Sequence, residues 1–141
     1  MERKRPGNGW AWVGPYDPGT RGIDPGISAS GTYALISDTA GPVITNLNIA
    51  DDAFIKASYP EIRCTITDEL SGFEDDRNFD ITIDGKWLIP EYDPERDILS
   101  CRSHWGLSGG SHTLKIDVHD RSGNHTIIER KFRIRAKAPT P

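Results

Sequence analysis

A turn, a strand and a second turn follow one another in Leu107-Ser-Gly-Gly-Ser-His-Thr-Leu-Lys-Ile-Asp-Val-His-Asp-Arg-Ser-Gly-Asn124. Leu114, Ile116 and Val118 alternate with polar residues, which is typical of a β-strand with one buried and one solvated face. Glycine and other residues that tolerate positive φ stand at both ends of the strand. The stretch therefore predicts one strand of a β-sandwich.

Further short strands are predicted at regular spacing along the chain. They cover residues 43–49, 62–67, 79–83, 86–89, 98–101 and 127–134. No helical periodicity of comparable length competes with this alternation. Seven strands separated by turns predict an all-β fold, an immunoglobulin-like antiparallel β-sandwich with an N-terminal extension that contains strands of its own.

A tight hairpin is predicted at Asp84-Gly85, because this dipeptide favours a two-residue turn. In the register set by such a turn, Ile81 lies opposite Leu88 and both face the core. Trp87 lies opposite Thr82 and faces outward.

The first forty residues look like the end of a different unit. Two strands are expected, one at residues 10–13 and one at residues 32–37, and a Pro- and Gly-rich run separates them. Two strands do not bury a core alone, so they either pair with an upstream domain or dock on the sandwich as edge strands. We expect an extension over residues 1–40, the sandwich over 41–135 and a flexible tail over 136–141.

The composition excludes several classes of protein. The chain has 141 residues, with 14 glycines and 10 prolines. Its net charge of −4 gives no electrostatic reason to expect binding to nucleic acid. No apolar run approaches the roughly 20 residues that span a bilayer, so membrane insertion is not expected. Met1-Glu-Arg-Lys-Arg-Pro6 is not a signal peptide. Without a signal peptide or a membrane span, the chain alone would be expected in the cytoplasm. The N-terminal region instead favours the interpretation that the chain is a piece of a longer secreted protein.

Catalysis is not expected from these residues. His112 shares the inward parity of Leu114 and His119 points outward, so the two do not share a metal. No serine lies in a nucleophile-elbow pattern, and neither cysteine has a positioned base. Cys64 and Cys101 fall on strands of the same sheet, where they form either a disulfide or, as we favour, two buried thiols.

Acidic residues provide one candidate ligand site. Asp68 and Asp120 each end a strand, and these two strands run in the same direction, so both carboxylates are expected at one end of the sandwich. With Glu69 and Asn124 nearby they offer the oxygen ligands that calcium accepts. The alternative, which we favour, is that Asp68 and Asp120 cap the free amides of their own turns.

Aromatic residues provide the other candidate surface. Trp87 is predicted to face outward, and Tyr92 and Trp105 are expected in connections. Together they would offer a platform for a glycan or a partner protein. The alternative is that they pack over a sheet edge or under a loop.

A resemblance adds to this prediction. The motifs that carry it are Pro42-Val-Ile, Asp68-Glu-Leu-Ser-Gly72, Ile83-Asp-Gly-Lys-Trp87, Glu91-Tyr-Asp93, Leu107–Leu114 and Val118–Asn124. They resemble bacterial immunoglobulin-like or fibronectin-III-like domains of envelope and secreted proteins, and in particular the C-terminal modules that follow zinc peptidase domains of the lysostaphin-like (M23) kind. The zinc-binding histidine pairs of that peptidase have no counterpart here.

We therefore expect a non-catalytic accessory module of a secreted, periplasmic or envelope-associated bacterial protein. It would act as a spacer, docking or interaction domain for a neighbouring domain of the same polypeptide or for an envelope protein. It needs no cofactor in this interpretation. The alternative is a module that binds calcium or a cell-wall glycan.

Overall fold

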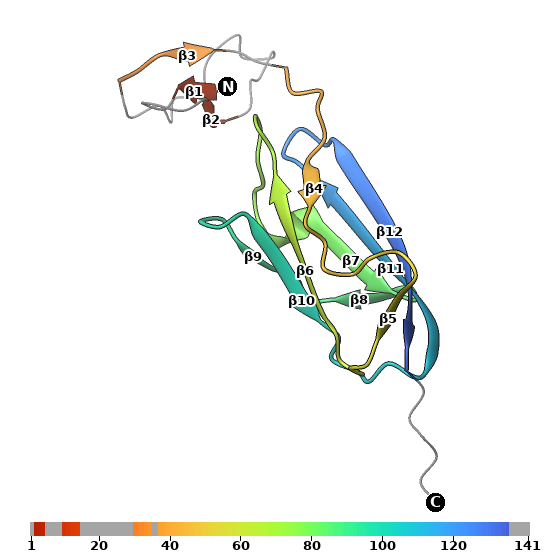
Figure 1. Ribbon diagram of the computed structural model, residues 1–141. Helices are drawn as coiled ribbons and strands as arrows, with labels where there is room; N and C mark the ends of the chain where they lie inside the picture. Colours follow the sequence, from red (N-terminus) through yellow and green to blue (C-terminus); the bar gives the residue numbers. More distant parts are fainter. Residues whose placement is uncertain (1, 5–9, 15–29, 35–36, 136–141) are drawn as a thin grey trace, which may run out of the picture.

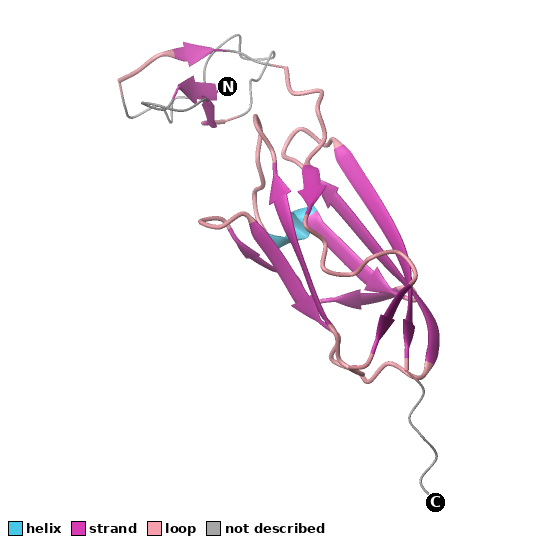
Figure 2. Ribbon diagram, viewed as in Figure 1, coloured by secondary structure: helices cyan, strands magenta, loops and turns pink. Residues whose placement is uncertain are grey.

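The computed structural model describes residues 2–4, 10–14, 30–34 and 37–135, and these residues form mostly β-strands (Figure 1, Figure 2). The strands group into three sheets with the orders β2-β1-β3, β4-β6-β10-β9 and β5-β12-β11-β7-β8. The four- and five-stranded sheets face each other as a sandwich. The three-stranded sheet lies beyond one end of it (Figure 1).

The N-terminal sheet contains one strand more than the sequence predicts. Its strands are β1 (Glu2–Lys4), β2 (Trp10–Trp12) and β3 (Tyr33–Ala34). The unpredicted β1 lies in the middle and pairs antiparallel with both others. Of the predicted strand at residues 32–37, positions 35 and 36 lie outside the described residues. In the described part of the chain these strands are hydrogen-bonded to each other and to no strand of the sandwich, so they do not extend its sheets as edge strands. Pairing with an upstream domain stays a prediction.

The sandwich contains nine strands within the described residues, where the sequence predicts seven. The four-stranded sheet comprises β4 (Val43–Thr45), β6 (Glu61–Thr67), β10 (Ile98–Arg102) and β9 (Glu91–Asp93). The five-stranded sheet comprises β5 (Ala53–Ile55), β12 (His125–Ile134), β11 (Gly110–His119), β7 (Phe79–Ile83) and β8 (Lys86–Leu88). Within the described residues the one helix is of the 3-10 type, covers Asp76–Asn78 and precedes β7.

This strand order is that of the immunoglobulin fold. In that fold, strands A, B, E and D form one sheet, and strands G, F and C form the other, with C′ added beside C in the larger form. The order β4-β6-β10-β9 matches the first sheet and β12-β11-β7-β8 the second. The expected immunoglobulin-like β-sandwich is thus confirmed.

The Asp84-Gly85 hairpin has the predicted register. Ile81 pairs with Leu88 and Thr82 with Trp87, and both turn residues have positive φ, 52° at Asp84 and 80° at Gly85. Positive φ at both positions is the mark of the type I′ turn. As a result Ile81 is fully buried, whereas Trp87 is 52% exposed.

The predicted strand at residues 43–49 is wrong in its length. Strand β4 ends at Thr45, and Asn46 then adopts a left-handed conformation with φ of 54°. The backbone amide of Asn48 still donates to the carbonyl of Arg63 at 3.0 Å. Its side chain adds two bonds to the same strand: the amide nitrogen donates to the carbonyl of Glu61 at 2.7 Å, and the amide oxygen accepts from the amide of Arg63 at 2.9 Å. The chain then crosses to the other sheet, where the unpredicted β5 pairs in parallel with β12.

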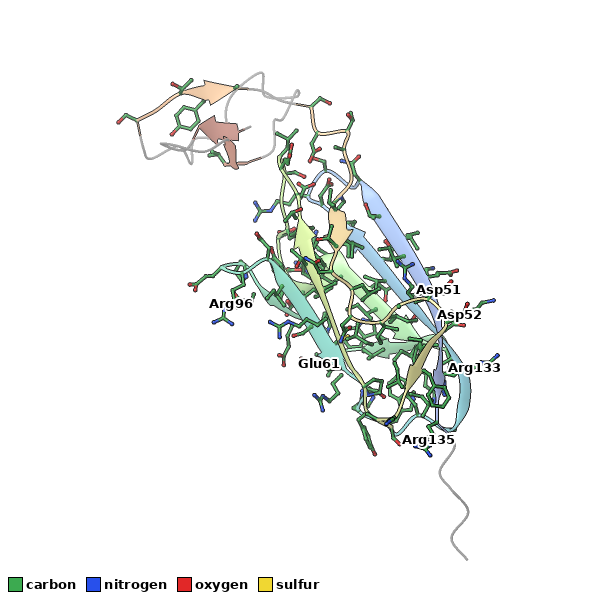
Figure 3. All side chains as sticks on the ribbon, in the orientation of Figure 1. Asp51, Asp52, Glu61, Arg96, Arg133 and Arg135 are labelled. Carbon is green, nitrogen blue, oxygen red and sulfur yellow. The ribbon has the colours of Figure 1, made fainter. Side chains whose placement is uncertain are left out.

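The core between the two sheets consists of the residues that alternate inward along the strands. Fully buried side chains come from β6, β7, β8, β10, β11 and β12, and include Ile62, Ile66, Ile81, Ile83, Leu88, Leu99, Leu114, Ile116, Val118 and Phe132. The charged side chains of Glu61, Arg96 and Arg133 lie on the outside (Figure 3). No helix in the described residues is long and apolar enough to cross a membrane.

Both cysteines are buried free thiols in the four-stranded sheet. Cys64 lies opposite Leu99, and Cys101 lies opposite Ile62, so the two are diagonal neighbours on β6 and β10. Diagonal neighbours are about 7–8 Å apart, beyond the usual span of a disulfide. Burial raises the pKa of Cys64 to about 11 and that of Cys101 to about 12. Both thiols are therefore protonated at neutral pH and behave as small apolar side chains.

Candidate functional site

Three aspartates converge at the end of the sandwich that adjoins the N-terminal segment. Asp68 follows β6, Asp120 follows β11, and Asp38 comes from the segment that leads into β4. One carboxylate oxygen of each lies within 4.8 Å of one of each of the others. The sequence-based expectation that Asp68 and Asp120 share one end of the sandwich therefore agrees with the geometry.

Asp120 is the most buried of the three and organises the turn between β11 and β12. Its side chain is 1% exposed. One carboxylate oxygen accepts hydrogen bonds from the amides of Ser122 and Asn124, both at 2.9 Å, and the other accepts from the Asn124 side chain at 2.9 Å. This is the turn-capping role that the sequence favours for an aspartate before Ser-Gly.

Asp68 and Asp38 hold the loop after β6 from two sides. Asp68 accepts from the amide of Gly72 at 2.6 Å, and Asp38 accepts from the amide of Ser71 at 3.1 Å. The Ser71 hydroxyl lies between the two carboxylates, 2.6 Å from Asp38 and 3.3 Å from Asp68. Ser71 is itself buried, so this loop is fixed by both aspartates.

The three carboxylates of the cluster repel one another when all are ionised. Burial raises the pKa of the Asp68 carboxyl, and the neighbouring charges of Asp38 and Asp120 raise it further, although the hydrogen bonds from Gly72 and Ser71 oppose the shift. A carboxylate that is desolvated beside two like charges is less readily ionised. A bound cation would relieve this repulsion.

The predicted calcium set is only partly assembled. Asn124 belongs to the cluster, since its side-chain amide donates to Asp120 and, at 3.0 Å, to the backbone carbonyl of Asp38. Glu69 is exposed and is not one of the three converging carboxylates. Asp38 takes its place. From the sequence, Asp38 is interpreted only as the first residue of a domain boundary, because nothing local links it to Ser71, 33 residues later.

The segment after Asp38 is fastened to the sandwich at further points. The Thr126 hydroxyl donates to the carbonyl of Pro42 at 2.5 Å. Gly41 lies so close to β12 that an added Cβ would stand 2.8 Å from the Thr126 hydroxyl and 3.1 Å from the carbonyl oxygen of His125. A side chain at position 41 would therefore force the segment and the strand apart.

His112 faces inward, as its parity predicts, and it has a structural role. It is 7% exposed, and its ring nitrogens lie 2.5 Å from the Asp84 carboxylate and 2.7 Å from the Ser108 carbonyl. Burial lowers the pKa of His112, but the bonds to Ser108 and Asp84 outweigh it and leave the pKa raised. The imidazole thus ties the β7–β8 turn to the start of β11.

The three aromatic side chains do not form a common platform. Trp87 is exposed on the outer face of the five-stranded sheet. Tyr92 lies in strand β9 rather than in a connection, and its ring packs against Phe79 with centroids 5.0 Å apart. Trp105 is half-buried in the loop after β10, with the Lys86 ammonium 5.4 Å from its ring centroid. Of the three, only Trp87 has an exposed side chain that a ligand or partner could contact.

Comparison with known proteins shows the fold and no family. No model of a protein family matches the sequence, and no curated protein matches it. CopC from Methylosinus trichosporium OB3b is similar in structure with a TM-score of 0.54 at 14% identity, over 71% of this chain and 99% of CopC.

Dimeric latent PorU from Porphyromonas gingivalis is similar with a TM-score of 0.59 at 15% identity, over 80% of this chain. The match spans only 12% of PorU, so it concerns a small part of that protein. The N-terminal Ig1-2 module of the Drosophila receptor tyrosine phosphatase DLAR has a TM-score of 0.48 at 12% identity, over 72% of this chain and 53% of that module. At identities this low, the likeness to CopC and PorU is one of β-sandwich architecture alone.

Proposed function

We propose that this chain is a non-catalytic immunoglobulin-like module that holds a neighbouring domain in a fixed direction. The observation that carries the proposal is the attachment of residues 38–42 to the end of the sandwich. Asp38 is bonded to Ser71 and Asn124, and Pro42 is bonded to Thr126. Residues 38–42 form the junction between the sandwich and the segment before it. A junction attached in this way fixes the direction of a neighbouring domain, whereas a solvated linker rich in Gly and Ser does not.

The setting that we propose for this module is the cell envelope or the exterior of a bacterium. The support for it is the motif resemblance to modules that follow M23 peptidase domains. The partner in this proposal is a domain of the same polypeptide or another envelope protein. The conclusion about catalysis rests on the site itself, because the aspartates and His112 are engaged in turn and loop contacts.

The proposal is tested by the mobility of the junction. Backbone order parameters for residues 38–42 should match those of the β-strands, about 0.85. In Asn124→Ala, which removes the bond to the Asp38 carbonyl, they should fall while the core strands keep theirs. Glu69→Gln at the same end is the matched control. Order parameters below about 0.6 at the junction of the unmodified chain would contradict the proposal.

A second candidate is calcium binding at the same end. The observation that favours it is the third carboxylate, Asp38, which joins Asp68 and Asp120 within 4.8 Å. Oxygen ligands of this kind suit calcium. Here the measurement is the melting temperature in chelator and in calcium. A ligand that binds only the folded state raises stability with the logarithm of its concentration, so a shift of no more than about a degree or two across excess calcium would reject this candidate.

A further inference from the structure

A pair of histidines lies on the outer face of the five-stranded sheet, next in sequence to Asp120 and Asn124 of the acidic cluster. His119 ends β11 and His125 begins β12, and the two are cross-strand partners. Their rings are stacked, with centroids 5.1 Å apart and planes 27° apart. Directly opposed residues of an antiparallel pair present their side chains to the same side of the sheet.

The ring of His125 is held by a carboxylate. Its Nδ1 lies 2.8 Å from a carboxylate oxygen of Asp117, and His125 is 53% exposed at the side chain against 23% for Asp117. A hydrogen bond from Nδ1 to a carboxylate fixes the tautomer that leaves Nε2 with its lone pair free. It also makes that nitrogen a stronger ligand.

The surroundings leave room for a ligand. Both histidines and Asp117 line a hollow of about 540 Å³ on this face, together with Asp76, Asp80, Trp87 and Arg77. The Arg77 guanidinium is paired with the Asp75 carboxylate. In the described part of the chain, the ring of His119 makes a ring contact with His125 but no hydrogen bond. Two imidazole donors are thus available at an open site.

We propose that His119 and His125 form a two-imidazole site for a divalent transition-metal ion of the nickel and zinc class. Neutral imidazole nitrogens bind such ions, with bonds of about 2.0–2.1 Å to zinc. Asp117 acts as the positioning residue, because it contacts His125 and orients the ring. Water fills the remaining positions around the metal. Calcium, which takes oxygen ligands, is not the ion that suits this pair.

The test is a titration of the full chain, free of any histidine tag, with Ni²⁺ and with Zn²⁺ by isothermal calorimetry. We expect one saturable site per chain. His119→Ala and His125→Ala should each abolish it, and the corresponding glutamine variants should do the same with less disturbance of the surface. Asp117→Asn should weaken binding by about 10–100-fold, as loss of a carboxylate behind a ligating histidine does.

Two controls separate this site from other causes of binding. His104→Ala removes an exposed histidine outside the pair and should leave the affinity unchanged. Asp68→Asn alters the acidic cluster and should also leave it unchanged. The proposal is overturned if the chain shows no saturable binding, or if binding survives the loss of either histidine. Unchanged affinity in Asp117→Asn would overturn the positioning role.

Discussion

Neutralising Asp68 should stabilise the protein in the absence of divalent cations. Asp68→Asn keeps the shape of the side chain and one carbonyl oxygen, which can continue to accept from Gly72 and Ser71. It removes the charge that stands beside Asp38 and Asp120. The balance therefore favours the variant, because the hydrogen bonds are retained while the repulsion is lost.

The magnitude follows from the separation of the carboxylates. At 4.8 Å, the upper limit of the separation between the converging carboxylate oxygens, the repulsion of two unit charges is about 0.9 kcal/mol with the dielectric constant of water and about 3.5 kcal/mol at an effective dielectric constant of about 20. Asp68 is half-buried, so solvent screening keeps the value near the lower end. The substitution removes two such repulsions, Asp68 with Asp38 and Asp68 with Asp120. We therefore expect a gain of about 1–2 kcal/mol in the free energy of unfolding.

The assay is urea unfolding at neutral pH, in chelator and in excess calcium. Glu69→Gln, which removes a charge from the adjacent exposed residue, is the control and should change stability by less than about 0.5 kcal/mol. In calcium the order should reverse if the three carboxylates bind the ion, because only the unmodified chain keeps the full ligand set. A variant less stable than the parent in chelator would refute the electrostatic reasoning.

The pH dependence supplies an independent check on the same residue. The pKa of Asp68 is raised above its ordinary value of 3.8 in the folded protein, so the folded state binds this proton more readily than the unfolded state. Stability from this group therefore increases as pH falls through the raised pKa and stops changing below the ordinary one. Asp68→Asn should lack this increase, and a parent chain with the same acid profile as the variant would contradict it.

Three further predictions concern other parts of the chain. Ile81→Ala should cost about 2–5 kcal/mol of unfolding free energy as measured in urea, whereas Trp87→Ala, on the exposed side of the same hairpin, should cost less than about 1 kcal/mol. A chain that starts at Asp38 should fold cooperatively, with a melting temperature within a few degrees of the parent. The pKa of His112 is raised in the folded protein, so protonated His112 stabilises the fold. This contribution is complete below the ordinary pKa of histidine and is lost as pH rises through the folded value. Asp84→Ala should diminish this loss, as measured by urea unfolding at several pH values.

The sandwich could be predicted wherever a local rule sets the geometry. The Asp84-Gly85 turn defines the register of β7 and β8 by itself, and the alternation around Leu114 defines the buried face of β11. The switch of the chain between sheets after Thr45 could not be predicted in this way. It depends on the Asn48 side chain, whose partners Glu61 and Arg63 lie on another strand.

The candidate sites show the same division. Asp68 and Asp120 were predicted to share one end because strand direction follows from the order of the strands. Asp38 was missed, since its partner Ser71 is brought to it only by the folded loop. His119 and His125 flank the turn between β11 and β12. They become partners only in the register that the two strands adopt across this turn, and the sequence motif does not specify that register.

The junction and the acidic cluster are parts of one structure, because Asp38 belongs to both. Its carboxylate is one of the three that converge, and its backbone carbonyl accepts from Asn124. A cation that drew the carboxylates together would therefore also strengthen the attachment of residues 38–42. By linkage, the factor by which the cation strengthens this attachment is the factor by which the attachment raises the affinity for the cation. The two candidate functions can be separated by this coupling: in Asn124→Ala, calcium should restore the junction order parameters if the cluster binds the ion, and should leave them low if the aspartates serve only as caps.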